Sequence, residues 1–102
     1  MASVPLLTTE ELEPGHMRGF NVAGRRINVY NVAGTFFATS DNCFHRGGLL
    51  SEGDLEGTIV TCPWHGWQFD CRTGENPRSA EARIDTYPVI VVGNLVHVNV
   101  GE

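Results

Sequence analysis

Two short segments each carry one cysteine and one histidine, and this pattern constrains the chain more than any other feature. The first segment is Cys-Phe-His at 43–45, and the second is Cys-Pro-Trp-His at 62–65, with sixteen residues between them. Thiolate sulfur and imidazole nitrogen are ligands of zinc and of iron. Glycine, proline and aromatic residues surround both segments, which is typical of loops. We therefore interpret the two cysteines and two histidines as ligands of one metal site held between two loops.

Two kinds of metal site use four such ligands. Structural zinc sites usually pair Cys with Cys and His with His, and place the second pair on a helix. Here each pair is mixed, and no helical pattern follows either one. A binuclear centre fits mixed pairs better, because each loop then gives one ligand to each metal. The alternative, from a different functional class, is a zinc-stabilised interaction module with no redox role.

Composition excludes several other classes of protein. The chain has 102 residues, which fits a single domain spanning 1–102. Its formal charge is -5, and no basic stripe is present, so we expect no nucleic-acid partner. The first nine residues lack the pattern of a signal peptide, and no apolar run approaches the ~18 residues of a membrane span. We therefore expect a cytoplasmic protein without a membrane anchor.

The number of cysteines indicates whether disulfides could hold the fold together. The chain has three cysteines, and two of them belong to the paired motif. The odd count argues against a disulfide scaffold. We expect the third, Cys71, to be a small packed residue and not a ligand.

The rest of the chain alternates short strand-like runs with turn residues, which predicts an all-β fold. We expect strands over 17–22, 26–32, 35–39, 58–61, 67–70, 87–92 and 95–100, an edge strand over 4–7, a helical turn over 8–12 and a turn-rich stretch over 72–77. Gly93-Asn94 predicts a hairpin between the last two strands. Val96, Val98 and Val100 should face one side of the last strand, and Phe36 and Phe37 should face opposite sides of theirs.

These strands predict an antiparallel β-sandwich or barrel as the base domain. Residues 41–70, approximately, would form a small inserted subdomain of two loops that holds the metal.

The motif resembles that of the Rieske [2Fe–2S] family. The resemblance rests on Cys-x-His at 43–45, on Cys-Pro-Trp-His-Gly-Trp at 62–67, and on the Gln-Phe-Asp and Thr-Gly that follow at 68–70 and 73–74. It implies the Rieske fold and one [2Fe–2S] cluster. Its inner iron would be held by Cys43 and Cys62, and its outer iron by His45 and His65.

The sixteen-residue gap resembles the branch of the family that serves bacterial oxygenases. This resemblance implies a ferredoxin, a one-electron carrier that is not itself an enzyme. It would pass electrons from a flavin-dependent NAD(P)H reductase to a terminal oxygenase of the aromatic-ring-hydroxylating type. Two alternatives stay open. One is the small subunit of an assimilatory nitrite reductase, which shares the fold, although many such subunits lack the four ligands. The other is a fragment of an oxygenase α subunit, in which the Cys-Pro-Trp-His-Gly-Trp run also occurs. The last strand is complete before Glu102, which favours a whole carrier over a fragment.

The ligand set and its neighbours also bear on the redox potential. Two thiolates cancel the charge of about +2 on an oxidised cluster core, so the mixed site accepts an electron more readily than a four-cysteine site. Quinol-oxidising members of the family add a disulfide and two hydroxyl groups near the cluster. Gly48, Trp64, Trp67 and Phe69 stand at those positions here. We therefore expect a potential at the low end of about −150 to +300 mV.

The surface around the loops is expected to be acidic. Asp41, Glu52, Asp54 and Glu56 lie close to the motif, and we expect them to be solvated surface charges. The alternative is that they form a docking patch for a basic face of the reductase. Because a carrier must present one exposed tip, we also expect a monomer.

Overall fold

The chain is built almost wholly of short antiparallel strands. The structure is a computed structural model that describes residues 3–42, 48–63 and 66–100. The strands are β1 (Ser3–Thr8), β2 (His16–Val22), β3 (Arg25–Val32), β4 (Thr35–Ser40), β5 (Asp54–Glu56), β6 (Ile59–Thr61), β7 (Gln68–Asp70), β8 (Glu75–Asn76), β9 (Ser79–Arg83), β10 (Thr86–Tyr87), β11 (Val89–Val92) and β12 (Leu95–Asn99). Two 3₁₀ turns complete the described part, η1 (Thr9–Glu11) and η2 (Leu50–Glu52). The predicted all-β class is confirmed.

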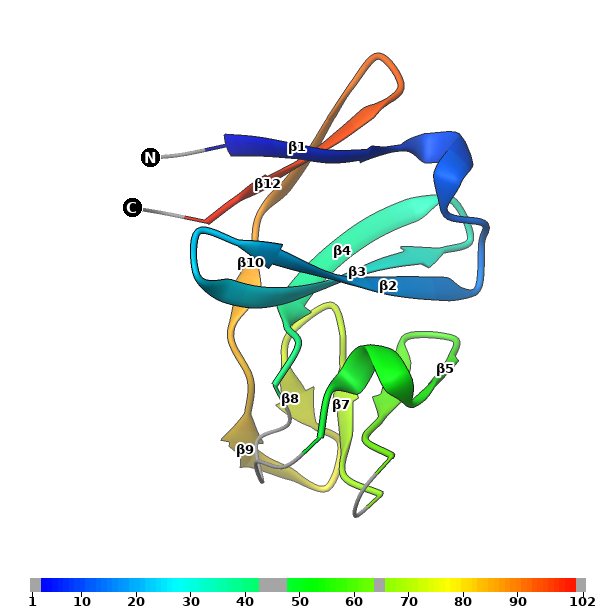
Figure 1. The fold of residues 1–102 in the computed structure, drawn as a ribbon. Coiled ribbons are helices and arrows are strands. Elements are labelled where there is room, and N and C mark those ends of the chain that lie inside the picture. Colours follow the sequence, from blue (N-terminus) through cyan, green and yellow to red (C-terminus); the bar gives the residue numbers. More distant parts are fainter. Residues whose placement is uncertain (1–2, 43–47, 64–65, 101–102) are drawn as a thin grey trace.

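Two sheets form the upper tier of the molecule (Figure 1). One has the strand order β1-β12-β11 and the other β10-β4-β3-β2, with all pairs antiparallel. Val96, Val98 and Val100 are buried while His97 and Asn99 are partly exposed, so the predicted alternation is confirmed. The buried apolar residues of this upper core are Leu7, Leu12, Val22, Ile27, Val29, Ala38, Val96, Val98 and Val100.

A smaller lower tier lies beneath these sheets (Figure 1). It consists of the three-stranded sheet β5-β6-β7, the two-stranded sheet β8-β9 and the turn η2. Its core is separate from the upper one and comprises Tyr30, Leu50, Val60, Cys62, Phe69, Cys71 and Ile84. The region between about 41 and 70 supplies most of this tier, and its definition as a subdomain stays our interpretation.

Strand β3 contributes to both cores because its side chains alternate. Ile27 and Val29 enter the upper core, whereas Tyr30 enters the lower one. The neighbouring strand β4 does the same with Phe36 and Phe37, which pack against the upper and the lower core respectively. The predicted opposite orientation of these two phenylalanines is thus confirmed.

Two predicted segments in the last third of the chain differ from the structure. The run 87–92 is not one strand, because Tyr87 pairs with Ala38 of β4 whereas Val89 pairs with Val98 of β12. Pro88 separates the two, since it has no amide hydrogen to donate to a ladder. The expected turn-rich stretch 72–77 contains β8, which pairs with β9, a strand that the sequence did not predict.

The start of the chain agrees with expectation. Strand β1 lies at the edge of its sheet, as Pro5 predicts. The helical turn that follows begins where the backbone N–H of Thr8 donates to the carboxylate of Glu11 at 2.8 Å. Over the described ranges no helix has the length and apolarity that crossing a bilayer requires.

Candidate metal centre

Cys62 is the candidate ligand that the structure describes. It follows β6 directly, its residue is 1% exposed, and its thiol is free of any disulfide with the other described cysteine. Cys43, His45 and His65 lie outside the described residues. The described part of the site therefore consists of Cys62 and of the paired backbone segments that flank each loop, which we call the stems.

The second loop is closed by backbone hydrogen bonds at its base. The N–H of Cys62 donates to the carbonyl of Trp67 at 2.7 Å, and the N–H of Gly66 donates to the carbonyl of Cys62 at 3.2 Å. Gly66 has a φ of +73°, a conformation in which a side chain is strained. Beneath this closure Thr61 pairs with Gln68 on the β6–β7 hairpin. The strand pair thus presents Cys62 at the start of a tight turn.

The first loop also has a paired stem. Asn42 and Leu49 form an antiparallel bridge, and the N–H of Leu50 donates to the carbonyl of Asp41 at 2.7 Å. The described residues on either side of the first ligand segment are therefore neighbours in space. Cys43 follows this stem directly in the sequence, so the stem determines where the first ligand segment begins.

Asp41 is not a surface residue, which corrects the expected acidic group. It is completely buried, whereas Glu52, Asp54 and Glu56 are exposed. Its carboxylate accepts hydrogen bonds from the guanidinium of Arg26 and from the backbone and hydroxyl of Ser51. A buried carboxylate requires such partners, because burial of an unpaired charge is very unfavourable. This network is not predicted by the sequence pattern, although Arg26 in a strand with a buried face is a signal for it.

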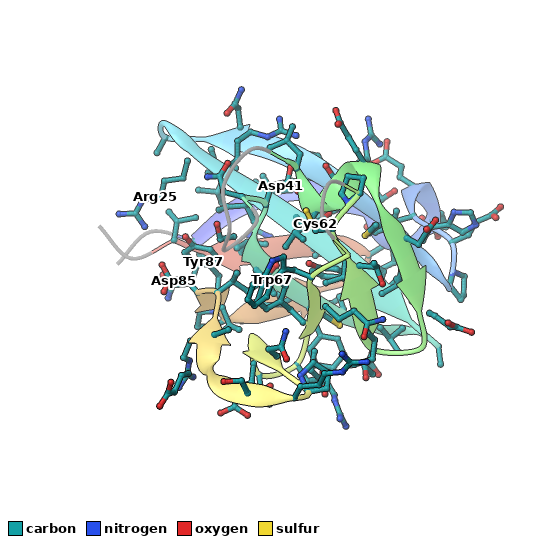
Figure 2. All side chains as sticks on the ribbon, turned by 90° about the horizontal axis from the view of Figure 1, so that it is seen from below. Arg25, Asp41, Cys62, Trp67, Asp85 and Tyr87 are labelled. Carbon is teal, nitrogen blue, oxygen red and sulfur yellow. The ribbon has the colours of Figure 1, made fainter. Side chains whose placement is uncertain are left out.

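The two stems are packed against each other. A Cβ placed on Gly53, just after η2, would collide with the carbonyl oxygen of Thr61 and lie 3.1 Å from Pro63 Cδ. Leu50, which follows the first loop, shares the lower core with Cys62. In Figure 2, which looks up at the lower tier, Asp41, Cys62 and Trp67 lie in the same region of the view. The structure thus brings the exit of the first loop to the entry of the second.

Aromatic side chains support the second loop. The rings of Trp67 and Phe69 stack with centroids 6.5 Å apart and an interplanar angle of 13°. Phe69 is fully buried and Trp67 is partly buried against the lower core. Neither ring carries a hydroxyl group, in agreement with the premise of the low-potential prediction. Trp64 lies outside the described residues.

Cys71 lies at the other end of the β6–β7 hairpin from Cys62. Its N–H donates to the carbonyl of Thr58 at 2.8 Å, and its side chain belongs to the lower core. Burial raises the pKa of the Cys71 thiol to about 12. The prediction of a small packed residue is confirmed.

This arrangement fits an iron–sulfur cluster. Cys62 would offer its sulfur at the end of a hydrogen-bonded strand pair, and the stem of the other loop is packed beside it. Among the residues that the structure describes, no three His, Cys, Asp or Glu side chains gather as a competing metal site. The donor set that the sequence offers, two sulfurs and two nitrogens, suits a [2Fe–2S] cluster of mixed ligation.

Comparison with known proteins identifies the family. The family model for the Rieske [2Fe–2S] domain matches residues 2–88. The ferredoxin component of the p-cumate 2,3-dioxygenase system of Pseudomonas putida is 38% identical over 96% of this chain and 86% of its own length. The ferredoxin component of biphenyl 2,3-dioxygenase from Rhodococcus jostii is 43% identical over 74% of this chain and 70% of its own.

A solved structure agrees with these matches. In the complex of reduced oxygenase and oxidised ferredoxin of carbazole 1,9a-dioxygenase, one chain superimposes with a TM-score of 0.87. It is 32% identical and covers 94% of this chain and 91% of its own length. The match confirms the Rieske fold that the sequence predicts and favours the binuclear cluster over structural zinc. The chain therefore belongs to the Rieske [2Fe–2S] family, and within it to the electron carriers called ferredoxins.

Proposed function

We propose that Cys43 and Cys62 hold the inner iron of the cluster and that His45 and His65 hold the outer iron. Three observations support this assignment. Cys62 is buried at the base of its loop, the two loop stems are packed together, and the four residues reproduce the mixed ligand set of the family. The cluster supplies one-electron redox chemistry when bound. The described residues would orient Cys62 and keep the two stems packed against each other.

We further propose that the chain carries single electrons from a flavin-dependent NAD(P)H reductase to a terminal oxygenase that acts on aromatic compounds. The observation that carries this proposal is the similarity to ferredoxin components over most of both chains. Because the proposed electron donor uses NAD(P)H, we place the protein in the cytoplasm, and we expect a monomer in solution.

The ligand assignment is tested by substitution followed by spectroscopy. Protein purified with iron and sulfide available should contain acid-labile sulfide and give a paramagnetic resonance signal after dithionite. Cys43→Ser, Cys62→Ser, His45→Ala and His65→Ala should each remove or strongly alter that signal. Cys71→Ala is the matched control, since it removes a buried thiol outside the motif and should leave the signal intact. Colourless wild-type protein with bound zinc would overturn the proposal.

The electron-transfer role needs its own test. Reduction of the loaded protein by NAD(P)H should require a flavin reductase, and the reduced protein should be reoxidised by an oxygenase only when that enzyme can turn over. The midpoint potential should fall in the lower part of the range of about −150 to +300 mV. A loaded protein that oxygenases never reoxidise would overturn the assignment of the partner and leave the ligand assignment intact.

Acidic side chains on one side of the lower tier suit a basic reductase. Glu52, Asp54 and Glu56 are exposed on η2 and on β5, the edge strand of its sheet. Neutralising all three to Gln, Asn and Gln should slow reduction at low ionic strength and flatten its dependence on salt. Neutralising Glu10 and Glu11, which are exposed on η1 in the upper tier, is the control. Equal effects per charge removed would show that only net charge matters.

A further inference from the structure

We propose that Asp41 is a positioning residue for the first ligand loop. Its buried carboxylate, held by Arg26 and Ser51, would fix the stem from which Cys43 and His45 extend. This inference rests on the proposed ligand assignment. It goes beyond that assignment because it names a residue that is not a ligand and that nonetheless decides how tightly the cluster is held.

The hydrogen bonds of Asp41 connect three parts of the chain. One carboxylate oxygen accepts from the backbone N–H of Ser51 at 2.7 Å. The other accepts from the Ser51 hydroxyl at 2.9 Å and from Arg26 Nη2 at 2.8 Å and Nε at 3.2 Å. Arg26 belongs to β3, and Ser51 to η2 after the loop. The side chain therefore joins the strand before the first loop, the turn after it and the central strand of the fold.

The backbone of Asp41 makes the same connections. Its N–H donates to the carbonyl of Arg26 at 2.9 Å, and its carbonyl accepts from Leu50 at 2.7 Å. The stem pair of Asn42 and Leu49 follows immediately. Each end of the loop is thus held by both main-chain and side-chain bonds, and Cys43 is two residues beyond the carboxylate.

Because the network is buried, loss of any one partner should be costly. The Asp41 side chain is 0% exposed and that of Arg26 is 31% exposed, so the pair lies largely away from water. A buried charge whose partner is removed is left without compensation. A stem fixed in this way would orient the ligands that follow it, as outer-shell partners orient metal ligands in other proteins.

Gly19 on β2 provides an independent sign that the network is closely fitted. A Cβ at this position would lie 2.5 Å from Arg26 Nη2, 2.6 Å from Asp41 Oδ2 and 2.7 Å from Ser51 Oγ. The absence of a side chain at residue 19 is therefore what allows all three groups to meet. Gly19→Ala would displace the network without removing any of its members.

The experiment measures release of the cluster from loaded protein to the chelator bathophenanthroline disulfonate, followed by visible absorbance. Asp41→Asn should accelerate release roughly 10–100-fold, a change as large as the loss of metal affinity that follows removal of an outer-shell partner in other proteins. Ser51→Ala and Gly19→Ala should act in the same direction, and both retain the charges of the pair. The reduced variants should also show shifted or broadened paramagnetic resonance, because the ligands are less well fixed.

Two controls separate positioning from general loss of stability. Asp70→Asn breaks a similar carboxylate–guanidinium pair, in which Arg72 Nη2 lies 2.8 Å from the carboxylate, but at the end of the hairpin away from the loops. It should change release by no more than about twofold, since the Arg72 side chain of that pair is 55% exposed and the pair lies away from both stems. Val98→Ala weakens the upper core without touching either stem. Release should be compared at guanidinium concentrations that are the same fraction of each loaded variant's unfolding midpoint.

The outcomes distinguish this inference from the assignment on which it rests. If Asp41→Asn and Ser51→Ala release the cluster as slowly as wild type, or no faster than Val98→Ala at equal stability, Asp41 has no positioning role. If Cys43→Ser keeps an unaltered cluster, the ligand assignment itself is wrong. Should Asp41→Asn fail to fold, the milder Ser51→Ala and Gly19→Ala decide the question.

Discussion

Gly53 lies against the carbonyl oxygen of Thr61 so closely that no side chain fits between them. Gly53 ends the turn that follows the first ligand loop, and Thr61 directly precedes Cys62. This contact therefore limits the separation between the end of the first stem and the start of the second. Since a cluster bound by both loops needs that separation to be maintained, the contact is a point at which a small change should have a large effect.

Gly53→Ala is expected to lower the free energy of unfolding by about 1–3 kcal/mol, because the added methyl group overpacks a site bounded by backbone. Its φ of −94° lies outside the left-handed region, and the prediction rests on the close contact with the backbone of Thr61. The loaded protein should also lose its cluster faster. Gly57→Ala is the control: Gly57 has a φ of +62° with no atom near its missing Cβ, so that change costs strain alone. Guanidinium unfolding and absorbance measure both effects, and equal cluster loss from the two variants would contradict the prediction.

The β11–β12 hairpin allows a comparison of two valines. Val98 is 0% exposed and Val92 is 59% exposed. Val98→Ala should lower the free energy of unfolding by about 2–3 kcal/mol, from two lost methyl groups and the cavity they leave. Val92→Ala should stay within about 0.5 kcal/mol of wild type. Denaturant titration tests the pair, and similar losses at both sites would refute the described orientation of β12.

The thiol of Cys71 should resist alkylation in the folded protein. Its pKa of about 12, raised by burial, keeps it protonated at pH 8, and its side chain is enclosed by the lower core. Iodoacetamide followed by peptide mass spectrometry should leave Cys71 unmodified in native protein and modify it fully in guanidinium. Rapid modification of native protein at this residue would show that the lower core opens readily.

The carboxylate of Asp70 should titrate at unusually low pH. Hydrogen bonds from the Arg72 side chain lower its pKa from the ordinary value, opposed by its desolvation. Because the folded pKa lies below the unfolded one, the pair's contribution to stability is complete above the unfolded pKa. It is lost as pH falls through the folded pKa. Arg72→Gln should therefore raise the Asp70 pKa seen by NMR, and the stability difference from wild type should vanish in strong acid. An unchanged Asp70 pKa would contradict the assigned cause.

Much of the fold follows from patterns that are local in the sequence. The alternation of Val96, Val98 and Val100 and the glycine-asparagine turn before them predict β12 correctly, because one face of that strand meets a core. The opposite burial of Phe36 and Phe37 follows from the same period of two. The motif itself predicts which residues to examine as ligands, and of these the structure describes Cys62.

What the sequence did not reveal depends on contacts between distant segments. Strand β9, Ser-Ala-Glu-Ala-Arg, has no β-branched or aromatic residue, and its pairing with β8 is a tertiary effect. Asp41 looked like a surface charge because its partner, Arg26, is fifteen residues away on another strand. The tight approach of Gly53 to Thr61 is likewise invisible until both segments are placed.

The participation of β3 in both cores has a practical consequence for protein engineering. Tyr30, which fills part of the lower core, comes from a strand whose alternate residues complete the upper one, and Cys71 and Ile84 of the same core also lie outside residues 41–70. A graft of 41–70 onto a foreign scaffold would leave this hydrophobic centre incomplete. The ligand loops are therefore transplantable only together with β3, which makes the whole β framework, rather than the motif, the unit that can be moved.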